Sequence, residues 1–272
     1  MRVGLIPVLL LVAALVGVPG CDKMQARSLI KEGNAHYKAG KLDEALALFE
    51  QARELDPQFP TLHLHLGYTH MAMASLASPA ESRRHWVGAA AAFKALMSIA
   101  PADDRAPRYY LQVLMDANKL EEALVFLKAQ HKANPRDVKT VSSLGLVSSR
   151  AGRFEEALGW YEKRAALLPD EAKAKYLIGT LCWKRLYKND RVLGVDRVRL
   201  ADRGLAALDR ALATQPDYAE ALTYKNLLHR ERAKGHDDEQ ARAKDMDKAR
   251  EYYKRAMVLI KGQSDKAKKK AN

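Results

Sequence analysis

Small and apolar residues recur along this chain at fixed intervals, and the recurring unit is 34 residues long. In its clearest copy, residues 26–59, the recurring positions are Gly33, Tyr37, Gly40, Ala45, Phe49, Ala52 and Pro57. A glycine in the first half of the unit lets one helix approach its neighbour, and a second glycine turns the chain between two helices. The proline ends the second helix because it cannot continue one. The pattern therefore predicts a series of helix-turn-helix units.

Six copies of this unit cover almost the whole chain after its N-terminal segment. Their expected bounds are 26–59, 60–103, 104–137, 138–171, 172–218 and 219–261. The second, fifth and sixth copies exceed 34 residues, and we expect the excess in loops or inserts near 74–84, 188–199 and 234–244. In the sixth copy the second helix is expected to pack through Ala249, Tyr253 and Ala256. Because Ala, Leu, Lys, Arg and Glu dominate and β-branched runs are scarce, the composition favours an all-α fold.

The recurring positions resemble those of the tetratricopeptide repeat family, and the resemblance spans residues 26–261. It implies a right-handed superhelix of stacked helix pairs, an α-solenoid whose inner groove is lined by the first helix of each pair. Such a surface is used for binding. The resemblance therefore implies a protein that acts by holding a partner.

The same resemblance suggests which side chains line the groove. In the family, ligand contacts come from the second, fifth, ninth, twelfth and thirteenth places of each repeat. The candidate groove residues are then Asn34, Tyr37, Tyr68, Arg105, Arg108, Gln112, Lys139, Arg150, Tyr176, Trp183 and Lys184. They are mainly basic and aromatic, which suits an extended acidic or aromatic-containing peptide. The alternative for each residue is packing within the solenoid.

The first twenty residues have the pattern of an export signal. A single Arg precedes a charge-free stretch from Val3 to Val18, and small residues then lead to Cys21. The run from Val18 to Cys21 resembles the bacterial lipobox, although Pro19 departs from the usual small residue. We therefore expect cleavage before Cys21, lipidation of its thiol, and a short linker at 21–25. The alternatives are an ordinary signal peptide with an incidental Cys, or an uncleaved anchor.

The chain is strongly basic, with a formal net charge of +13. Such a surface attracts nucleic acid, anionic lipid or an acidic protein. An exported protein rarely meets nucleic acid, so we expect an acidic protein partner or an anionic membrane surface. Residues 262–272 are rich in Lys and are predicted to form a disordered tail.

Motifs that would indicate an enzyme or a metal site are absent from the sequence. It contains no Gly-rich phosphate loop, GxSxG elbow, HExxH pair or paired CxxC. His63, His65 and His70 lie on one predicted helix, but their repeat positions favour packing over metal binding. Cys182 stands where the family has a packing aromatic, so we expect a buried and inert thiol. We predict neither a catalytic activity nor a cofactor.

These observations favour a lipid-anchored repeat protein of the bacterial cell envelope, with the repeats in the periplasm. It would serve as an interaction scaffold or assembly factor that holds a protein or an extended peptide. The alternative is a basic envelope module that binds anionic lipid or polysaccharide.

Overall fold

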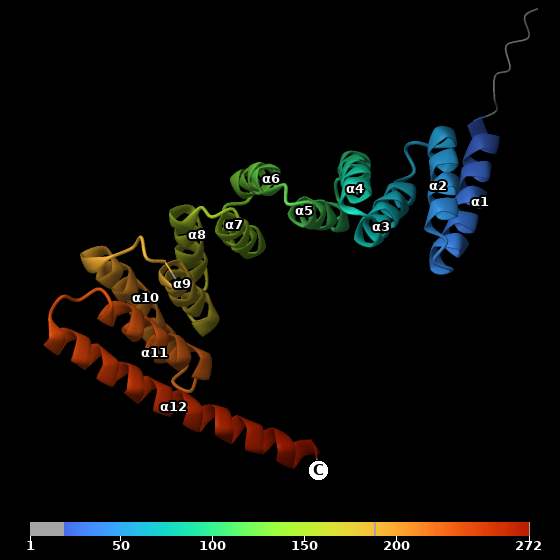
Figure 1. The fold of residues 1–272 in the computed structure, drawn as a ribbon. Helices are drawn as coiled ribbons and strands as arrows, with labels where there is room; N and C mark the ends of the chain where they lie inside the picture. Colours follow the sequence, from blue (N-terminus) through green and yellow to red (C-terminus); the bar gives the residue numbers. More distant parts are fainter. Residues whose placement is uncertain (1–18, 188, 272) are drawn as a thin grey trace, which may run out of the picture. The chain divides into compact units, whose positions relative to one another are not determined.

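The computed structural model describes residues 19–187 and 189–271, and in these residues it contains twelve α-helices and no strand (Figure 1). The helices are α1 (Pro19–Lys38), α2 (Leu42–Leu55), α3 (Pro60–Leu76), α4 (Pro79–Ile99), α5 (Arg105–Asp116), α6 (Leu120–Ala133), α7 (Val138–Arg150), α8 (Phe154–Leu167), α9 (Ala172–Leu186), α10 (Gly194–Thr214), α11 (Ala219–Ala233) and α12 (Glu239–Ala271). The all-α prediction is confirmed.

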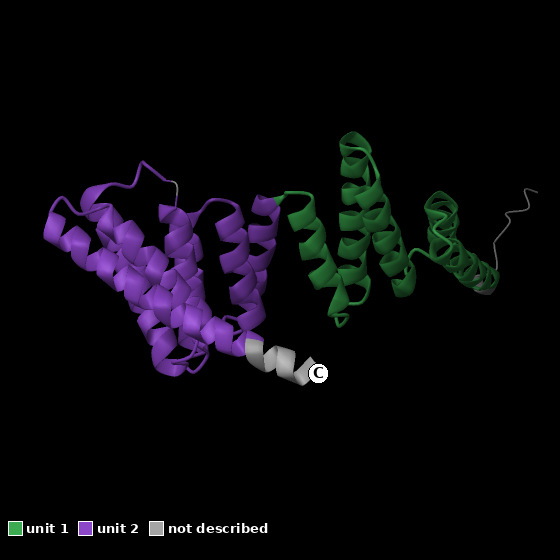
Figure 2. Cartoon of the chain, turned by 60° about the horizontal axis from the view of Figure 1, so that its bottom comes forward, with its two compact units in different colours: residues 1–119 green, residues 120–272 purple. Residues whose placement is uncertain are grey.

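The chain divides into two compact units (Figure 2). Unit 1, residues 1–119, contains α1 to α5, and unit 2, residues 120–272, contains α6 to α12. Within each unit, consecutive helices pack side by side. The division falls between α5 and α6, inside the predicted third repeat.

The recurring glycines of the sequence lie where two helices come closest. In unit 1 a Cβ added at Gly33 would lie 2.6 Å from the ring of Phe49, and one added at Gly67 would lie 2.4 Å from the ring of Phe93. Both rings are fully buried. Each glycine therefore makes room for a large side chain of the second helix, which explains their shared spacing.

The same arrangement continues in unit 2. Tyr161 lies against Gly145, and Leu208 lies against Gly179. In these two pairs the small residue is again glycine, whereas the large residue differs. The turn between the two helices of a pair also repeats. Gly40 and Gly152 take positive φ angles there, and Asn118 takes the equivalent place in the third repeat with φ 56°. Asn is one of the few other residues that tolerate this conformation.

The excess residues of the longer repeats form helix more than loop, which corrects the sequence-based prediction. In the second repeat the expected loop near 74–84 shrinks to two residues, because α3 continues to Leu76 and α4 begins at Pro79. Ser78 and Glu81 form a reciprocal capping box at the start of α4, which fixes the helix start at this point.

The inserts of the fifth and sixth repeats are also partly helical. Helix α10 begins at Gly194, within the expected insert 188–199, and α12 begins at Glu239, within 234–244. Helix α12 continues to Ala271, through the residues predicted to form a tail. Ala and Lys, which dominate residues 266–271, both favour helix.

At the other end of the chain, the apolar stretch from Val3 to Val18 lies outside the described residues. Helix α1 begins at Pro19 and includes the expected linker at 21–25. Cys21 is exposed in its first turn. Among the described helices, none is long and apolar enough to cross a membrane.

Candidate partner-binding site

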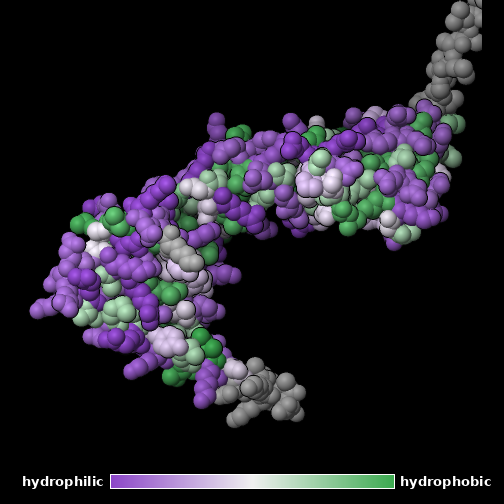
Figure 3. All heavy atoms as spheres, in the orientation of Figure 1, coloured by the Kyte–Doolittle hydropathy of each residue, from purple (hydrophilic) through white to green (hydrophobic). Residues whose placement is uncertain are grey.

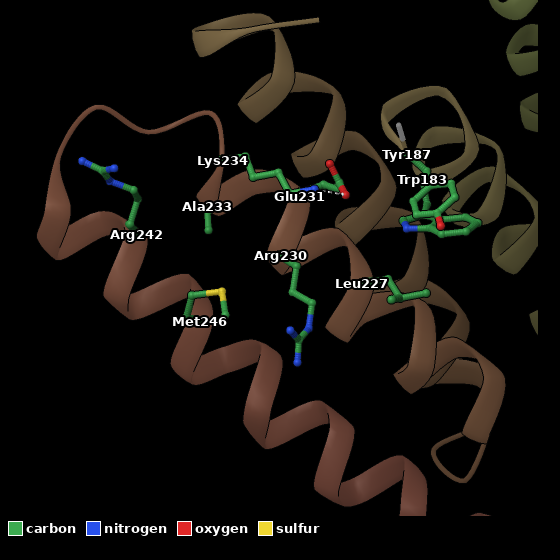
Figure 4. A pocket seen from close by; sticks show the side chains of 9 residues that line it. All are labelled: Trp183, Tyr187, Leu227, Arg230, Glu231, Ala233, Lys234, Arg242 and Met246. Carbon is green, nitrogen blue, oxygen red and sulfur yellow. Dashed lines mark hydrogen bonds and ion pairs between the residues drawn. The ribbon is translucent and has the colours of Figure 1, made fainter. Parts of the chain in front are cut away.

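A cavity of about 580 Å³ opens in unit 2 between α9, α11 and α12 (Figure 4). Trp183 and Tyr187 come from the end of α9, Leu227 and Arg230 from α11, and Met246 from α12. The remaining lining residues are Glu231, Ala233, Lys234 and Arg242. The cavity thus has apolar walls with basic groups around them, which we call the α9–α12 cavity.

The aromatic wall of this cavity belongs to a longer cluster of rings. Trp183 stacks on Tyr187 with the ring centroids 4.7 Å apart, and its edge meets Tyr224 at 5.3 Å. Tyr224 in turn contacts Tyr176, which lies 5.0 Å from Tyr218. Rings fixed by one another lose little conformational entropy when a partner covers them.

The basic groups of the cavity are accessible to a partner. Arg230, Lys234 and Arg242 are exposed, and Figure 4 shows Arg230 pointing from α11 towards α12. The Nε of Arg230 donates to Asn226 at 2.9 Å, which orients the guanidinium group. A guanidinium group held in this way suits recognition of a carboxylate.

Glu231, the one acidic residue among those that line the cavity, is paired with basic residues. Glu231 is buried and forms ion pairs with Arg197 of α10 and, at 2.7 Å, with Lys234. Arg197 is buried as well and also donates to the backbone carbonyls of Asn189 and Val192, at 2.5 and 2.8 Å. These bonds hold the segment between α9 and α10 against α11 and leave the cavity basic.

A second buried ionic cluster fixes α12 on α11. Asp245 of α12 accepts hydrogen bonds from Arg232, at 2.5 Å, and lies 2.8 Å from His229 and 2.9 Å from His236. Burial alone would raise the pKa of Asp245, but the hydrogen bonds of Arg232 and His229 hold it below the ordinary value. Lys225 adds an ion pair with Asp209 of α10. The wall formed by α12 is therefore rigidly placed.

The predicted groove residues are divided between the two units. Unit 1 holds Asn34, Tyr37, Tyr68, Arg105, Arg108 and Gln112, whereas unit 2 holds Lys139, Arg150, Tyr176, Trp183 and Lys184. Of the unit 2 residues, Trp183 lines the cavity and Tyr176 belongs to its ring cluster. Lys139, Arg150 and Lys184 are exposed.

Several of the unit 1 residues have partners within the fold. The side-chain amide of Asn34 lies 3.1 Å from His65, and Tyr37 packs against the core of the first repeat. Tyr68 meets Tyr109 edge to face at 4.9 Å, and Arg105 pairs with Asp103 at 2.7 Å. Arg108 and Gln112 are exposed on α5.

The histidines and the thiol singled out in the sequence serve packing. His63 is buried and bonds the carbonyl of Pro57 at 2.7 Å, His65 stacks on Phe49, and His70 lies beside His85. Within the described residues, no group of three or more possible ligands could hold a metal ion. Cys182 is fully buried, and this burial raises the pKa of its thiol to about 12.

Of the nine residues that line the cavity, the sequence reasoning found only Trp183. Leu227 and Arg230 occupy the ninth and twelfth places of the sixth repeat, so extending the same register by one repeat would have found them. Tyr187 and Met246 lie outside those places. Only the packing of the extended helices brings them to the cavity.

The fold and the cavity define a class of protein, a helical-repeat protein with a recessed surface of apolar and basic residues. Sequence models described as "TPR repeat" and "Tetratricopeptide repeat" match residues 33–73 and 140–175. The chain is therefore a tetratricopeptide repeat protein, and its fold is that of a protein–protein interaction scaffold. No curated protein matches the sequence significantly.

Several solved structures are similar to this chain over most of its length. The structure titled "Crystal structure of YrrB: a TPR protein with an unusual peptide-binding site" is 22% identical, covers 75% of this chain and 93% of its own, and has a TM-score of 0.46. A MamA protein is 15% identical, with 74% and 94% covered and a TM-score of 0.49. PilF of Pseudomonas aeruginosa is 17% identical, with 91% and 99% covered and a TM-score of 0.43.

Proposed function

We propose that this protein is a lipid-anchored scaffold or assembly factor of the bacterial cell envelope, and that its repeats bind a protein partner in the periplasm. The observation that carries the binding part of the proposal is the α9–α12 cavity. It combines stacked aromatic side chains with exposed arginines, and its only acid is already paired. Such a surface favours a partner segment with carboxylates next to aromatic or aliphatic side chains.

The anchoring part rests on Cys21 and the segment before it. The residues before Cys21 have the pattern of a lipoprotein signal, and Cys21 itself is exposed at the start of α1. Mass spectrometry of the membrane fraction tests this part. We expect Cys21 to be the modified first residue of the mature chain, and a Cys21→Ser variant to leave the membrane. An unmodified peptide that spans Gly20 and Cys21 would contradict it.

The binding part is tested with the partner recovered by crosslinking in intact cells. Losing a buried Trp or Arg contact costs ~2 kcal/mol or more at a hot spot, so the double variant Trp183→Ala with Arg230→Ala should weaken capture by more than ~30-fold. A matched control is Arg210→Ala with Leu193→Ala, because both side chains are exposed on unit 2 outside the cavity. Equal capture by both double variants would contradict a role for the cavity.

The competing function, a basic module for anionic lipid or polysaccharide, is favoured by the lysines at the end of α12. Deletion of residues 262–272 separates the two functions. Under the scaffold proposal the deletion changes mainly the rate and salt dependence of partner association, since exposed charges chiefly steer encounter. If it instead abolishes envelope association of the Cys21→Ser protein while the cavity variants bind normally, the lipid or polysaccharide function replaces the scaffold.

A further inference from the structure

Helix α12 exposes a row of large apolar side chains. Tyr253, Met257 and Ile260 are 51%, 45% and 44% exposed. In Figure 3, hydrophobic residues appear along this helix close to the grey residues at its C-terminal end. Exposed apolar side chains that gather on one helix mark an interaction surface.

This row lies on the same face of α12 as the wall of the α9–α12 cavity. Met246 lines the cavity, Tyr253 follows it by seven residues and Ile260 by fourteen, with Met257 four residues after Tyr253. Positions three, four and seven residues apart share one face of a helix. We call Met246, Tyr253, Met257 and Ile260 the α12 stripe. At 1.5 Å per residue it is ~21 Å long, which matches four turns of a second helix.

The charges beside the stripe are mainly basic. Arg250, Lys254 and Lys261 are exposed next to it, and Asp247, an acid on that side, pairs with Arg250. A second copy of this helix would bring like charges together. The stripe also continues into a recessed cavity, which a bilayer surface does not enter. The charge and the shape together favour an acidic, helical protein segment.

We infer that the α12 stripe binds an amphipathic helix of the partner, whose apolar side lies along Met246, Tyr253, Met257 and Ile260. Acidic residues on the flank of that helix then face Arg250, Lys254 and Lys261. The inference rests on the proposed binding function and specifies the form of the partner segment. It can fail while the cavity still binds an extended peptide, and the test separates these results.

The probe is a displayed library of ~18-residue amphipathic helices, long enough to cover the stripe. The apolar positions of the library helices are fixed, and the positions that flank them vary among Glu, Gln and Lys. Selection against the full-length protein should enrich helices with Glu on one flank. A synthetic peptide of the enriched sequence should lose about tenfold or more in affinity for a Met257→Glu variant. Val258→Glu is the matched control, because Val258 is adjacent and 72% exposed but lies on another side of α12.

Several results would overturn the inference. The first is failure to enrich any helix beyond a parallel selection against Met257→Glu. The second is an equal loss of affinity in the Met257→Glu and Val258→Glu variants. The third is a different ligand for the stripe. The parent protein could bind vesicles of phosphatidylglycerol and phosphatidylethanolamine that the Met257→Glu variant does not bind. Alternatively, the parent protein could form a dimer in solution that the Met257→Glu variant does not form. Loss of peptide binding in Trp183→Ala with Arg230→Ala, but not in Met257→Glu, would leave the cavity proposal intact and reject the stripe.

Discussion

The helix pairs at the two ends of the chain are held together by different physical means. In unit 1, Phe49 of α2 fills the space above Gly33 of α1, and the contact is entirely apolar. In the last pair, α11 and α12, Asn226 stands at the place of that glycine. The room for a ring is gone, and a buried ionic cluster around Asp245 joins the helices instead.

In this last pair the aromatic residue of the repeat also takes a different place. Tyr253, which the sequence pattern predicts to pack between the helices, is exposed, and this prediction is wrong. Its neighbour Tyr252 packs instead and stacks on His229 with ring centroids 5.5 Å apart. The change of contact releases Tyr253 to the surface, where it joins the α12 stripe.

The largest expected effect comes from removing the centre of the ionic cluster. An Asp245→Ala variant leaves Arg232 and His229 without their buried acceptor, and we expect the free energy of unfolding of unit 2 to fall by ~3–5 kcal/mol. Chemical denaturation followed by Trp183 fluorescence measures this. Asp247→Ala is the control, since Asp247 is exposed in a surface pair and should change stability by ~0–1 kcal/mol. Similar losses in both variants would mean that the cluster does not hold the two helices together.

A smaller effect is expected from filling the apolar contact of unit 1. Gly33→Val places new atoms against the ring of Phe49, and overpacking of this kind costs ~1–3 kcal/mol. In contrast, Gly159→Ala should stabilise by ~0.5–1 kcal/mol, because Gly159 lies in a helix with no atom near an added Cβ. Denaturation of each variant gives both values. If Gly33→Val were neutral, the close approach of α1 and α2 would not depend on glycine.

Acidic pH should lower the free energy of unfolding of unit 1 through His70, even though the helix pairs of unit 1 are joined mainly by apolar contacts. Burial, and then the charges of His85 and Arg53, lower the pKa of His70 from 6.5 to about 4. The unfolded chain therefore binds a proton that the folded protein excludes, so stability falls as the pH drops from 6.5 towards 4. After allowance for solvent screening we expect a loss of ~1 kcal/mol between pH 6.5 and 5.

Trp86, which packs against the core of unit 1, can report this loss in a protein with Trp160→Phe and Trp183→Phe. A His70→Gln variant should show a flatter dependence on pH. Unit 2 has a second acid-sensitive step, because Asp245 has a lowered pKa and contributes stability that is lost only below its ordinary value of 3.8. An unchanged slope in His70→Gln would assign the acid sensitivity of unit 1 to other groups.

The smallest effect concerns Cys182, which lies beneath Gly204 in the core of unit 2. Its buried thiol with a raised pKa should react with a thiol reagent only when unit 2 opens. In a Cys21→Ser background, labelling of the native protein should therefore be slow and should accelerate in the Asp245→Ala variant. Rapid labelling of the parent protein would place Cys182 in the reactive class.

The sequence predicts those parts of the molecule that repeat. Gly33 with Phe49 and Gly145 with Tyr161 are local pairs at a fixed spacing, so one copy of the unit is enough to place the next. The long-range ionic contacts do not recur at equivalent places of the repeats. Arg197 meets Glu231 across two helices, and only the folded arrangement of α10 and α11 brings them together.

The candidate site shows the same limit. Trp183 and Tyr176 could be assigned by repeat position, because the family register reaches α9. Met246 and Tyr187 could not be assigned in this way. Their places at the cavity depend on how the extended helix α12 and the segment after α9 pack in the fold. The expected loop near 74–84 is wrong for a different reason: the capping box of Ser78 and Glu81 starts α4 inside that stretch.

The ion pair between Arg197 and Glu231 has a consequence for how partner preference can change. Arg197 does not line the cavity, yet it acts as the counter-ion for the cavity's only carboxylate. A mutation that shortens or reorients the α9–α10 connection would therefore leave Lys234 as the ion-pair partner of Glu231, and would make the binding surface less basic without altering one lining residue. The charge selectivity of this scaffold can thus evolve from outside the site, in a segment that the repeat pattern leaves unconstrained.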